Sequence, residues 1–127
     1  MERPFTLDHL DHVVLRVRDL QKSVAFYQML GGDVQGPRPA GTAVRITPGQ
    51  TVILQERPDY VPAPISALDH INLAIRASNI QDVKEYLQAN GAEITRQPEE
   101  GRTNSPTLRV RDPDGHTIEI RIGSTPN

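Results

Sequence analysis

The sequence contains one internal repeat, and this repeat limits the possible folds more than any other feature. The segment Leu10–Leu15, which reads LDHVVL, returns 58 positions later as Leu68–Leu73, which reads LDHINL. Apolar residues at spacings of three and four follow each copy, preceded by Asp19 or Asn79 and ended by glycines. This pattern is typical of a helix with an N-cap and a glycine stop. The chain is therefore expected to fold as two copies of one module.

The rest of each copy predicts three strands. A short apolar strand follows each helix, and a hairpin then closes each half around a turn rich in Pro, Gly or Asp. Each half thus reads β-α-β-β-β. We predict an α+β fold in which two βαβββ modules form a curved mixed sheet around a cleft, with the helices on the outer face. The predicted hairpin strands are Ala43–Thr47 with Thr51–Gln55, and Thr107–Arg111 with His116–Ile122.

The length of 127 residues suits one domain. We expect modules at about 7–56 and 66–122, a proline-rich linker at 57–65, and mobile loops at 36–41 and 99–106 at the mouth of the cleft. A formal net charge of −2 gives no basic footprint for nucleic acid. No run of about 20 apolar residues is present, and the segment Met1–Pro4 lacks the apolar stretch of a signal peptide, so neither a membrane span nor a signal peptide is expected. The absence of cysteine excludes a thiolate metal site and a cysteine nucleophile, and a cytoplasmic location is the default expectation.

Strand side chains alternate between two faces, and this alternation gathers three metal-ligand residue types. The aliphatic face of each strand must pack against the helices. The opposite faces of three different strands then carry His12, His70 and Glu119. Two imidazoles and one carboxylate suit a divalent first-row metal and leave coordination positions open for substrate or water. Each residue alone is more simply a polar surface residue, but the histidines hold equivalent places in the repeat.

Several segments of the chain resemble the vicinal oxygen chelate superfamily, which includes glyoxalase I, methylmalonyl-CoA epimerase, extradiol dioxygenases, fosfomycin-resistance enzymes and bleomycin-binding proteins. The opening strand and helix of that family are similar to Leu10–Val17 and Ser23–Gly32. Leu68–Ile71 is similar to the start of its second module, and Arg111–Glu119 to its closing hairpin. The resemblance covers nearly the whole chain and is more specific for the fold than for the reaction.

The resemblance implies that His12, His70 and Glu119 occupy the common metal positions, for Zn, Ni, Mn, Co or Fe. The fourth ligand of glyoxalase I falls on Ile53, which cannot ligate, although a register shift of one residue would bring Glu56 inward. Three ligands are closer to fosfomycin-resistance enzymes and extradiol dioxygenases. The dioxygenase alternative is weakened because Arg109 stands where those enzymes carry a tyrosine.

The same strand faces carry arginines, which bind carboxylate or phosphate in a bidentate manner. We therefore expect an oxygen-rich anionic small molecule in the cleft. The main hypothesis is a metal-dependent lyase, isomerase or group transferase, with Glu119 and Glu56 as catalytic candidates. The alternatives are a non-catalytic binding protein of the bleomycin-resistance type and, less favoured, a ferrous dioxygenase. The resemblance also suggests a homodimer, in which the cleft forms within one chain or across two. The predicted substrate-binding residues are Arg16, Arg45, Asn72, Arg109 and Arg121, with Tyr60 as a further candidate.

Overall fold

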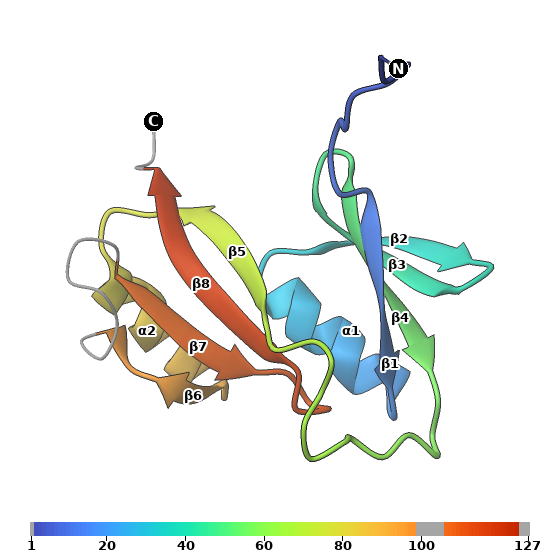
Figure 1. The fold of residues 1–127 in the computed structure, drawn as a ribbon. Coiled ribbons are helices and arrows are strands. Elements are labelled where there is room, and N and C mark those ends of the chain that lie inside the picture. Colours follow the sequence, from blue (N-terminus) through green and yellow to red (C-terminus); the bar gives the residue numbers. More distant parts are fainter. Residues whose placement is uncertain (1, 99–105, 125–127) are drawn as a thin grey trace. The chain divides into compact units, whose positions relative to one another are not determined.

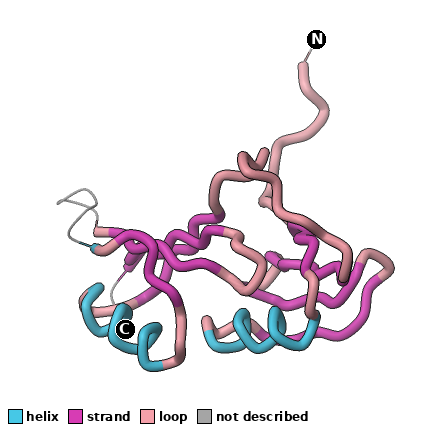
Figure 2. Tube along the Cα trace, turned by 90° about the horizontal axis from the view of Figure 1, so that it is seen from below, coloured by secondary structure: helices cyan, strands magenta, loops and turns pink. Residues whose placement is uncertain are grey.

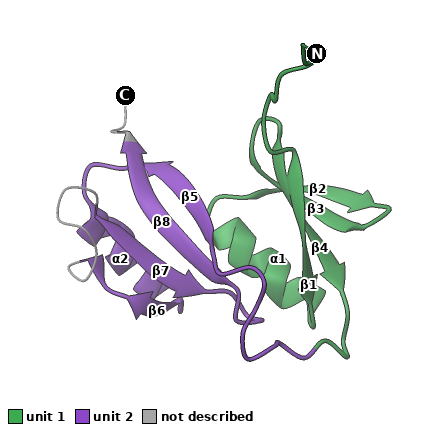
Figure 3. Cartoon of the chain, in the orientation of Figure 1, with its two compact units in different colours: residues 1–60 green, residues 61–127 purple. Residues whose placement is uncertain are grey.

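The computed structural model describes residues 2–98 and 106–124 (Figure 1). Residues 99–105 of the predicted loop at 99–106 lie outside this described part. The chain divides into two units, residues 1–60 and residues 61–127 (Figure 3), and each contains one β-α-β-β-β series. The elements are β1 (His12–Val17), α1 (Leu20–Met29), β2 (Asp33–Arg38), β3 (Gly41–Thr47) and β4 (Gln50–Glu56), then β5 (Ile71–Arg76), α2 (Ile80–Ala89), β6 (Glu93–Arg96), β7 (Thr107–Arg111) and β8 (Thr117–Ser124).

Each unit carries its own mixed sheet of four strands. The strand order is β1-β4-β3-β2 in the first unit and β5-β8-β7-β6 in the second. The first strand of each unit pairs in parallel with the last, and the remaining pairs are antiparallel. Figure 2 shows the helix of each unit running beside the strands of that unit. The predicted α+β fold of two βαβββ modules is confirmed, with one four-stranded sheet in each module.

Both helices begin and end as the sequence predicts. The Asp19 side chain accepts a hydrogen bond from the Lys22 backbone N–H, and the Asn79 side chain accepts one from the Asp82 backbone N–H. These are N-caps, which satisfy donors that the first turn of a helix leaves free. Each helix is ten residues long, and no helix among the described residues is both long enough and apolar enough to cross a membrane.

Strand register confirms the assignment of the two faces in each sheet. Leu15 lies opposite Leu54 across β1 and β4, and Ile71 lies opposite Ile118 across β5 and β8. A Cβ atom on Gly32, in the turn between α1 and β2, would collide both with the Val44 side chain and with the Tyr27 carbonyl of α1, so Val44 lies on the face toward the helix. The buried aliphatic residues on the helix faces of the two sheets include Leu15, Val17, Val44, Val52 and Leu54, and Leu108, Val110, Ile118 and Ile120.

The region after α1 differs from the prediction. Residues 36–41 were expected to form a loop, but β2 continues to Arg38 and pairs with β3 as far as Gly41. The sequence shows no strand signal beyond Val34, because a β-bulge lies between Val34 and Gly36 and Pro37 follows it. Proline is tolerated there because β2 is the outer strand of its sheet, where a missing N–H breaks no ladder.

Candidate metal and anion site

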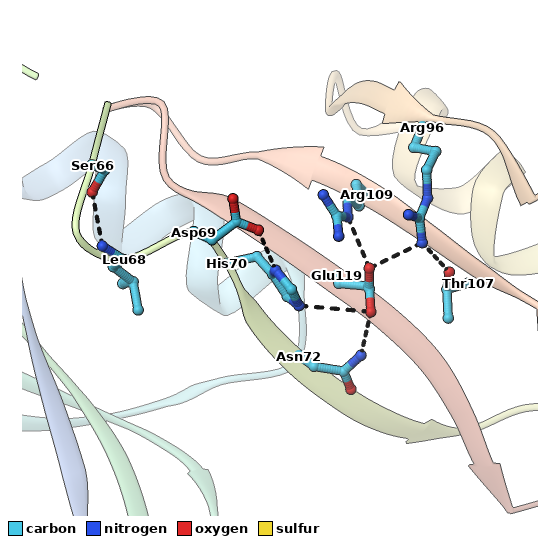
Figure 4. Close-up of polar contacts among 9 residues, drawn as sticks. All are labelled: Ser66, Leu68, Asp69, His70, Asn72, Arg96, Thr107, Arg109 and Glu119. Carbon is cyan, nitrogen blue, oxygen red and sulfur yellow. Dashed lines mark hydrogen bonds and ion pairs between the residues drawn. The ribbon is translucent and has the colours of Figure 1, made fainter. Parts of the chain in front are cut away.

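The carboxylate of Glu119 is the centre of a polar cluster on the helix-free face of the second unit (Figure 4). Its Oε1 accepts a hydrogen bond of 2.8 Å from the Asn72 amide. Its Oε2 accepts one of 2.8 Å from Nε of Arg109 and one of 3.0 Å from a terminal amino group of Arg96. The Glu119 side chain is 12% exposed. Four strands build the cluster, because Asn72 lies opposite Glu119 on β5, Arg109 lies opposite it on β7, and Arg96 lies opposite Arg109 on β6.

The surroundings of Glu119 keep its carboxylate ionised. Burial raises the pKa of the Glu119 carboxyl, because a charged group loses hydration there. Hydrogen bonds from Arg109 and Asn72, with the charges of Arg109 and His70, outweigh burial and hold the pKa below its usual range. Two guanidinium groups thus donate hydrogen bonds to one carboxylate.

Each predicted histidine ligand is held by the aspartate that precedes it. Nδ1 of His70 lies 2.7 Å from the Asp69 carboxylate, and Nδ1 of His12 lies 2.8 Å from the Asp11 carboxylate. These hydrogen bonds hold the pKa of both aspartates below their usual range. With a carboxylate as acceptor, Nδ1 is the protonated nitrogen and Nε2 is available as a metal donor.

The two donors in the second unit fit a divalent ion in chemistry, while their spacing is wider than a single tetrahedral ion requires. Nε2 of His70 and Oε1 of Glu119 face each other at 3.9 Å. Two donors of one tetrahedral ion, each about 2.1 Å from it, stand roughly 3.4 Å apart. Among the residues that the structure describes, no group of three or more His, Cys, Asp or Glu side chains is gathered for metal binding. His12 belongs to the other unit, and its part in the site stays a prediction.

Two of the other predicted binding residues, Arg16 and Arg45, belong to the first unit, and Arg121 belongs to the second. Arg45 forms an ion pair of 2.8 Å with Asp33 on the neighbouring strand of the first unit. Arg16 lines an open cavity of about 280 Å³ in the first unit, together with Arg57, Asp59 and Tyr60. Arg121 is exposed and lies two residues after Glu119, on the same face of β8. Only Asn72 and Arg109 of the five predicted binding residues therefore contact Glu119.

Glu56, the second catalytic candidate, contacts the helix of its own unit. Its Oε2 accepts a hydrogen bond of 2.9 Å from the Leu20 backbone N–H, at the start of α1. A carboxylate at a helix N-terminus satisfies a free donor and interacts favourably with the helix dipole. Glu56 lies beside Val17 in the strand register, which places it on the helix face, while Ile53 lies beside Val14 on the opposite face.

Sequence reasoning missed Arg96. The short apolar strand expected after the second helix did not extend as far as Arg96. The pairing of β6 with β7 shifts register between Ile94 and Arg96, as the pairing of β2 with β3 does between Val34 and Gly36. Continuing the repeat alignment from Gly36 would have placed Arg96 beside the cluster.

Comparison with known proteins defines the family. The family model described as "Glyoxalase/Bleomycin resistance protein/Dioxygenase superfamily" matches residues 9–120, and the chain belongs to this superfamily. It is 30% identical over 121 residues to the glutathione transferase FosA of Serratia marcescens, covering 93% of this chain and 83% of that protein. It is 29% identical over 120 residues to the metallothiol transferase FosB of Staphylococcus epidermidis, covering 91% of this chain and 82% of that protein.

Solved structures show the same fold. The structure of a glyoxalase/dioxygenase from Nostoc punctiforme superimposes with a TM-score of 0.81. The match covers 100% of this chain and 97% of that one, at 22% sequence identity. At this identity the likeness concerns the fold and leaves the reaction open.

Proposed function

We propose that this chain is a divalent-metal-dependent enzyme that transfers a group to a small, oxygen-rich anionic substrate. The observation that carries the proposal is the Glu119 cluster. Its ionised carboxylate has one oxygen directed at His70 and the other held by two arginines. The relatives named as a glutathione transferase and a metallothiol transferase support group transfer as the reaction class.

In this proposal His70 and Glu119 hold the ion together with His12. Hydrogen bonds donated by Nδ1 of His70 and His12 to Asp69 and Asp11 orient the imidazoles, as carboxylate partners of metal-binding histidines usually do. When bound, the ion would supply Lewis acidity toward oxygen atoms of the substrate. Glu56 accepts a hydrogen bond at the start of α1, and it is the further candidate for a base or a fourth metal ligand.

Arg109 is the proposed partner of the anionic group of the substrate. It donates to Glu119 through Nε, and its two terminal amino groups form no hydrogen bond or ion pair with another residue of the described part. A guanidinium with two such groups can bind two oxygens of a carboxylate or a phosphonate. Arg16, Arg45 and Arg121 are secondary candidates because none of them contacts Glu119.

The proposed reaction class is the addition of a thiol to an electrophilic carbon that carries oxygen. The thiol gives up its proton, and the sulfur–carbon bond forms as a carbon–oxygen bond of an epoxide breaks. The oxygen takes up a proton, so the product is a thioether alcohol that contains every atom of both reactants. Thiol adducts of 2-oxoaldehydes are the second substrate set, for which the reaction would be an isomerisation.

Metal analysis and turnover together test the proposed function. Protein purified without chelator is expected to contain stoichiometric metal, which the variants Glu119→Ala and His70→Ala lose. The metal-loaded protein is then given thiols with anionic epoxides, and thiol adducts of 2-oxoaldehydes, and thioether or isomerised product is measured. Arg111→Gln is a matched control because Arg111 lies in the same hairpin and pairs with Glu93 at 3.8 Å.

Other outcomes favour the alternatives. A chain that binds small anions but contains no metal, with binding unchanged in His12→Ala, would be a sequestering protein of the bleomycin-resistance type. Bound iron with oxygen consumption would indicate a dioxygenase. We further propose a homodimer, and mixing His12→Ala with Glu119→Ala protein tests whether partner chains share a site. If mixing restores metal binding, the site takes ligands from two chains. If mixing restores none, all ligands come from one chain.

A further inference from the structure

Arg96 contacts the proposed metal ligand Glu119 on the side away from His70. One terminal amino group of Arg96 donates to Oε2 of Glu119 at 3.0 Å and also to the Thr107 hydroxyl. The other carboxylate oxygen, Oε1, faces His70 and Asn72 (Figure 4). Arg96 is therefore anchored at both β7 and β8, and it reaches only the oxygen that does not face His70.

The position of Arg96 would be unfavourable without Glu119. Arg96 and Arg109 lie directly opposite each other on β6 and β7. Like charges at opposed positions of an antiparallel pair destabilise a sheet. Both guanidinium groups donate to the same carboxylate oxygen, which offsets their repulsion.

A β-bulge and a buried unpaired donor also accompany this contact. The ladder between β6 and β7 shifts register just before Arg96, and bulges commonly redirect a side chain near a functional site. Nε of Arg96 is buried and has no hydrogen-bond partner among the described residues. Leaving a buried donor unpaired costs about 1–3 kcal/mol. Arg96 thus keeps its hydrogen bonds to Thr107 and Glu119 although its buried Nε forms none.

We propose that Arg96 is a positioning residue that fixes the rotation of the Glu119 carboxylate. By holding Oε2, it keeps Oε1 directed at His70 and available as a single-oxygen ligand to a divalent ion. Arg109 shares Oε2 but binds through Nε, so its terminal amino groups stay available to a substrate. This inference rests on the proposed metal site. It assigns a role at that site to Arg96 on β6, which is not one of the proposed metal ligands.

Metal affinity is the measurement that tests the inference. Zn²⁺ and Mn²⁺ are titrated into the metal-free full-length chain in competition with a chelator, for the wild type, Arg96→Gln, Arg96→Lys and Arg111→Gln. Partners of metal ligands typically contribute about 10–100-fold to affinity. Arg96→Gln is therefore expected to weaken binding by about that factor. Arg96→Lys should recover part of it, and the control Arg111→Gln should bind as the wild type does.

Thermal unfolding of the metal-free variants separates positioning from stability. If Arg96 only stabilises the sheet, Arg96→Gln lowers the melting temperature but leaves metal affinity unchanged, and the inference is wrong. Tighter metal binding in Arg96→Gln also overturns it, because Arg96 would then compete with the ion for Glu119. A wild-type chain that binds neither ion contradicts the proposed metal site itself, which is a different failure.

A double-mutant cycle with Thr107 sharpens the test. Thr107→Val removes the second anchor of Arg96 while keeping the volume of the side chain. It is expected to weaken metal binding less than Arg96→Gln does, and to add almost no further loss when Arg96 is already Gln. Fully additive effects would mean that Thr107 does not act through Arg96, and the positioning account would fail.

Discussion

The two modules share one strand framework but place opposite chemistry on its helix-free face. Strand register makes four positions of the second unit equivalent to four of the first. The second unit carries Asn72, Arg96, Arg109 and Glu119 there. At the same places the first unit carries Val14, Gly36, Ala43 and Ile53.

The four small or apolar residues of the first unit show that this strand arrangement forms without the polar residues found in the second unit. Ile53 is 7% exposed and Ala43 is 1% exposed, so in the first unit these positions are buried without any polar partner. Replacing a buried ion pair by apolar residues is often neutral or stabilising. The charged cluster of the second unit is thus not needed to fill this place in the framework, which agrees with the proposed role in ligand binding.

The largest expected effect is that of Glu119→Ala. The substitution leaves Arg96 and Arg109 facing each other without their shared anion. Because their side chains are 32% and 27% exposed, water screens part of the repulsion, and we expect a loss of about 2–3 kcal/mol. Urea denaturation at neutral pH measures the change. An unfolding free energy unchanged from the wild type would show that the cluster is not coupled to folding.

The contribution of the Glu119 cluster to the stability of the wild type should decrease in acid. The pKa of Glu119 in the folded chain lies below its value in the unfolded chain, which is about 4.3. Its contribution to stability is then complete above that pH and is lost as the pH falls through the folded pKa. Unfolding free energy measured from pH 6 to pH 3 should fall less in Glu119→Gln than in the wild type. Parallel curves for the two proteins would contradict the lowered pKa.

A smaller effect on stability is expected at Glu56, where the two units also differ. The strand register makes Ile122 its equivalent in the second unit, so only the first unit has this carboxylate at its helix. Glu56→Gln is expected to lower the unfolding free energy by about 0.5–1 kcal/mol and to leave metal affinity unchanged. A loss of metal binding in this variant would instead make Glu56 a fourth ligand.

Converting the second unit to the pattern of the first is expected to change stability no more than Glu56→Gln does. The variant Asn72→Val, Arg96→Gly, Arg109→Ala and Glu119→Ile should keep the unfolding free energy within about 1 kcal/mol of the wild type, while it loses metal binding. Comparing its urea midpoint with that of Glu119→Ala tests this directly. If the fourfold variant is the less stable of the two, the cluster itself stabilises the fold.

The sequence predicted the elements and faces well because these depend on local geometry. Strand side chains alternate with a period of two, so parity alone placed Glu119 opposite the helix side and Ile53 at the equivalent place. Asp19 and Asn79 were recognised as caps because a cap depends on residues three positions away. The boundaries of β2 were missed because its continuation depends on pairing with β3 rather than on its own sequence.

The partners of the charged residues required the tertiary structure. Glu56 reaches the backbone of Leu20, 36 positions away, and Asn72 reaches Glu119 across 47 positions. Nothing local in either segment specifies these contacts, because they depend on which strands pair and in what register. Arg96 reaches Glu119 only because a bulge shifts its strand by one residue.

The sequence by itself determined the repeat, the two helices with their caps, and the strand face on which each candidate residue lies. Those properties follow from the spacing of side chains along a helix or a strand, which the covalent chain imposes. Only the tertiary structure decided that two arginines share one oxygen of Glu119 and that the other oxygen faces His70. That arrangement arises from four strands meeting in one register, since hydrogen-bond geometry across a sheet is set by all of its strands together.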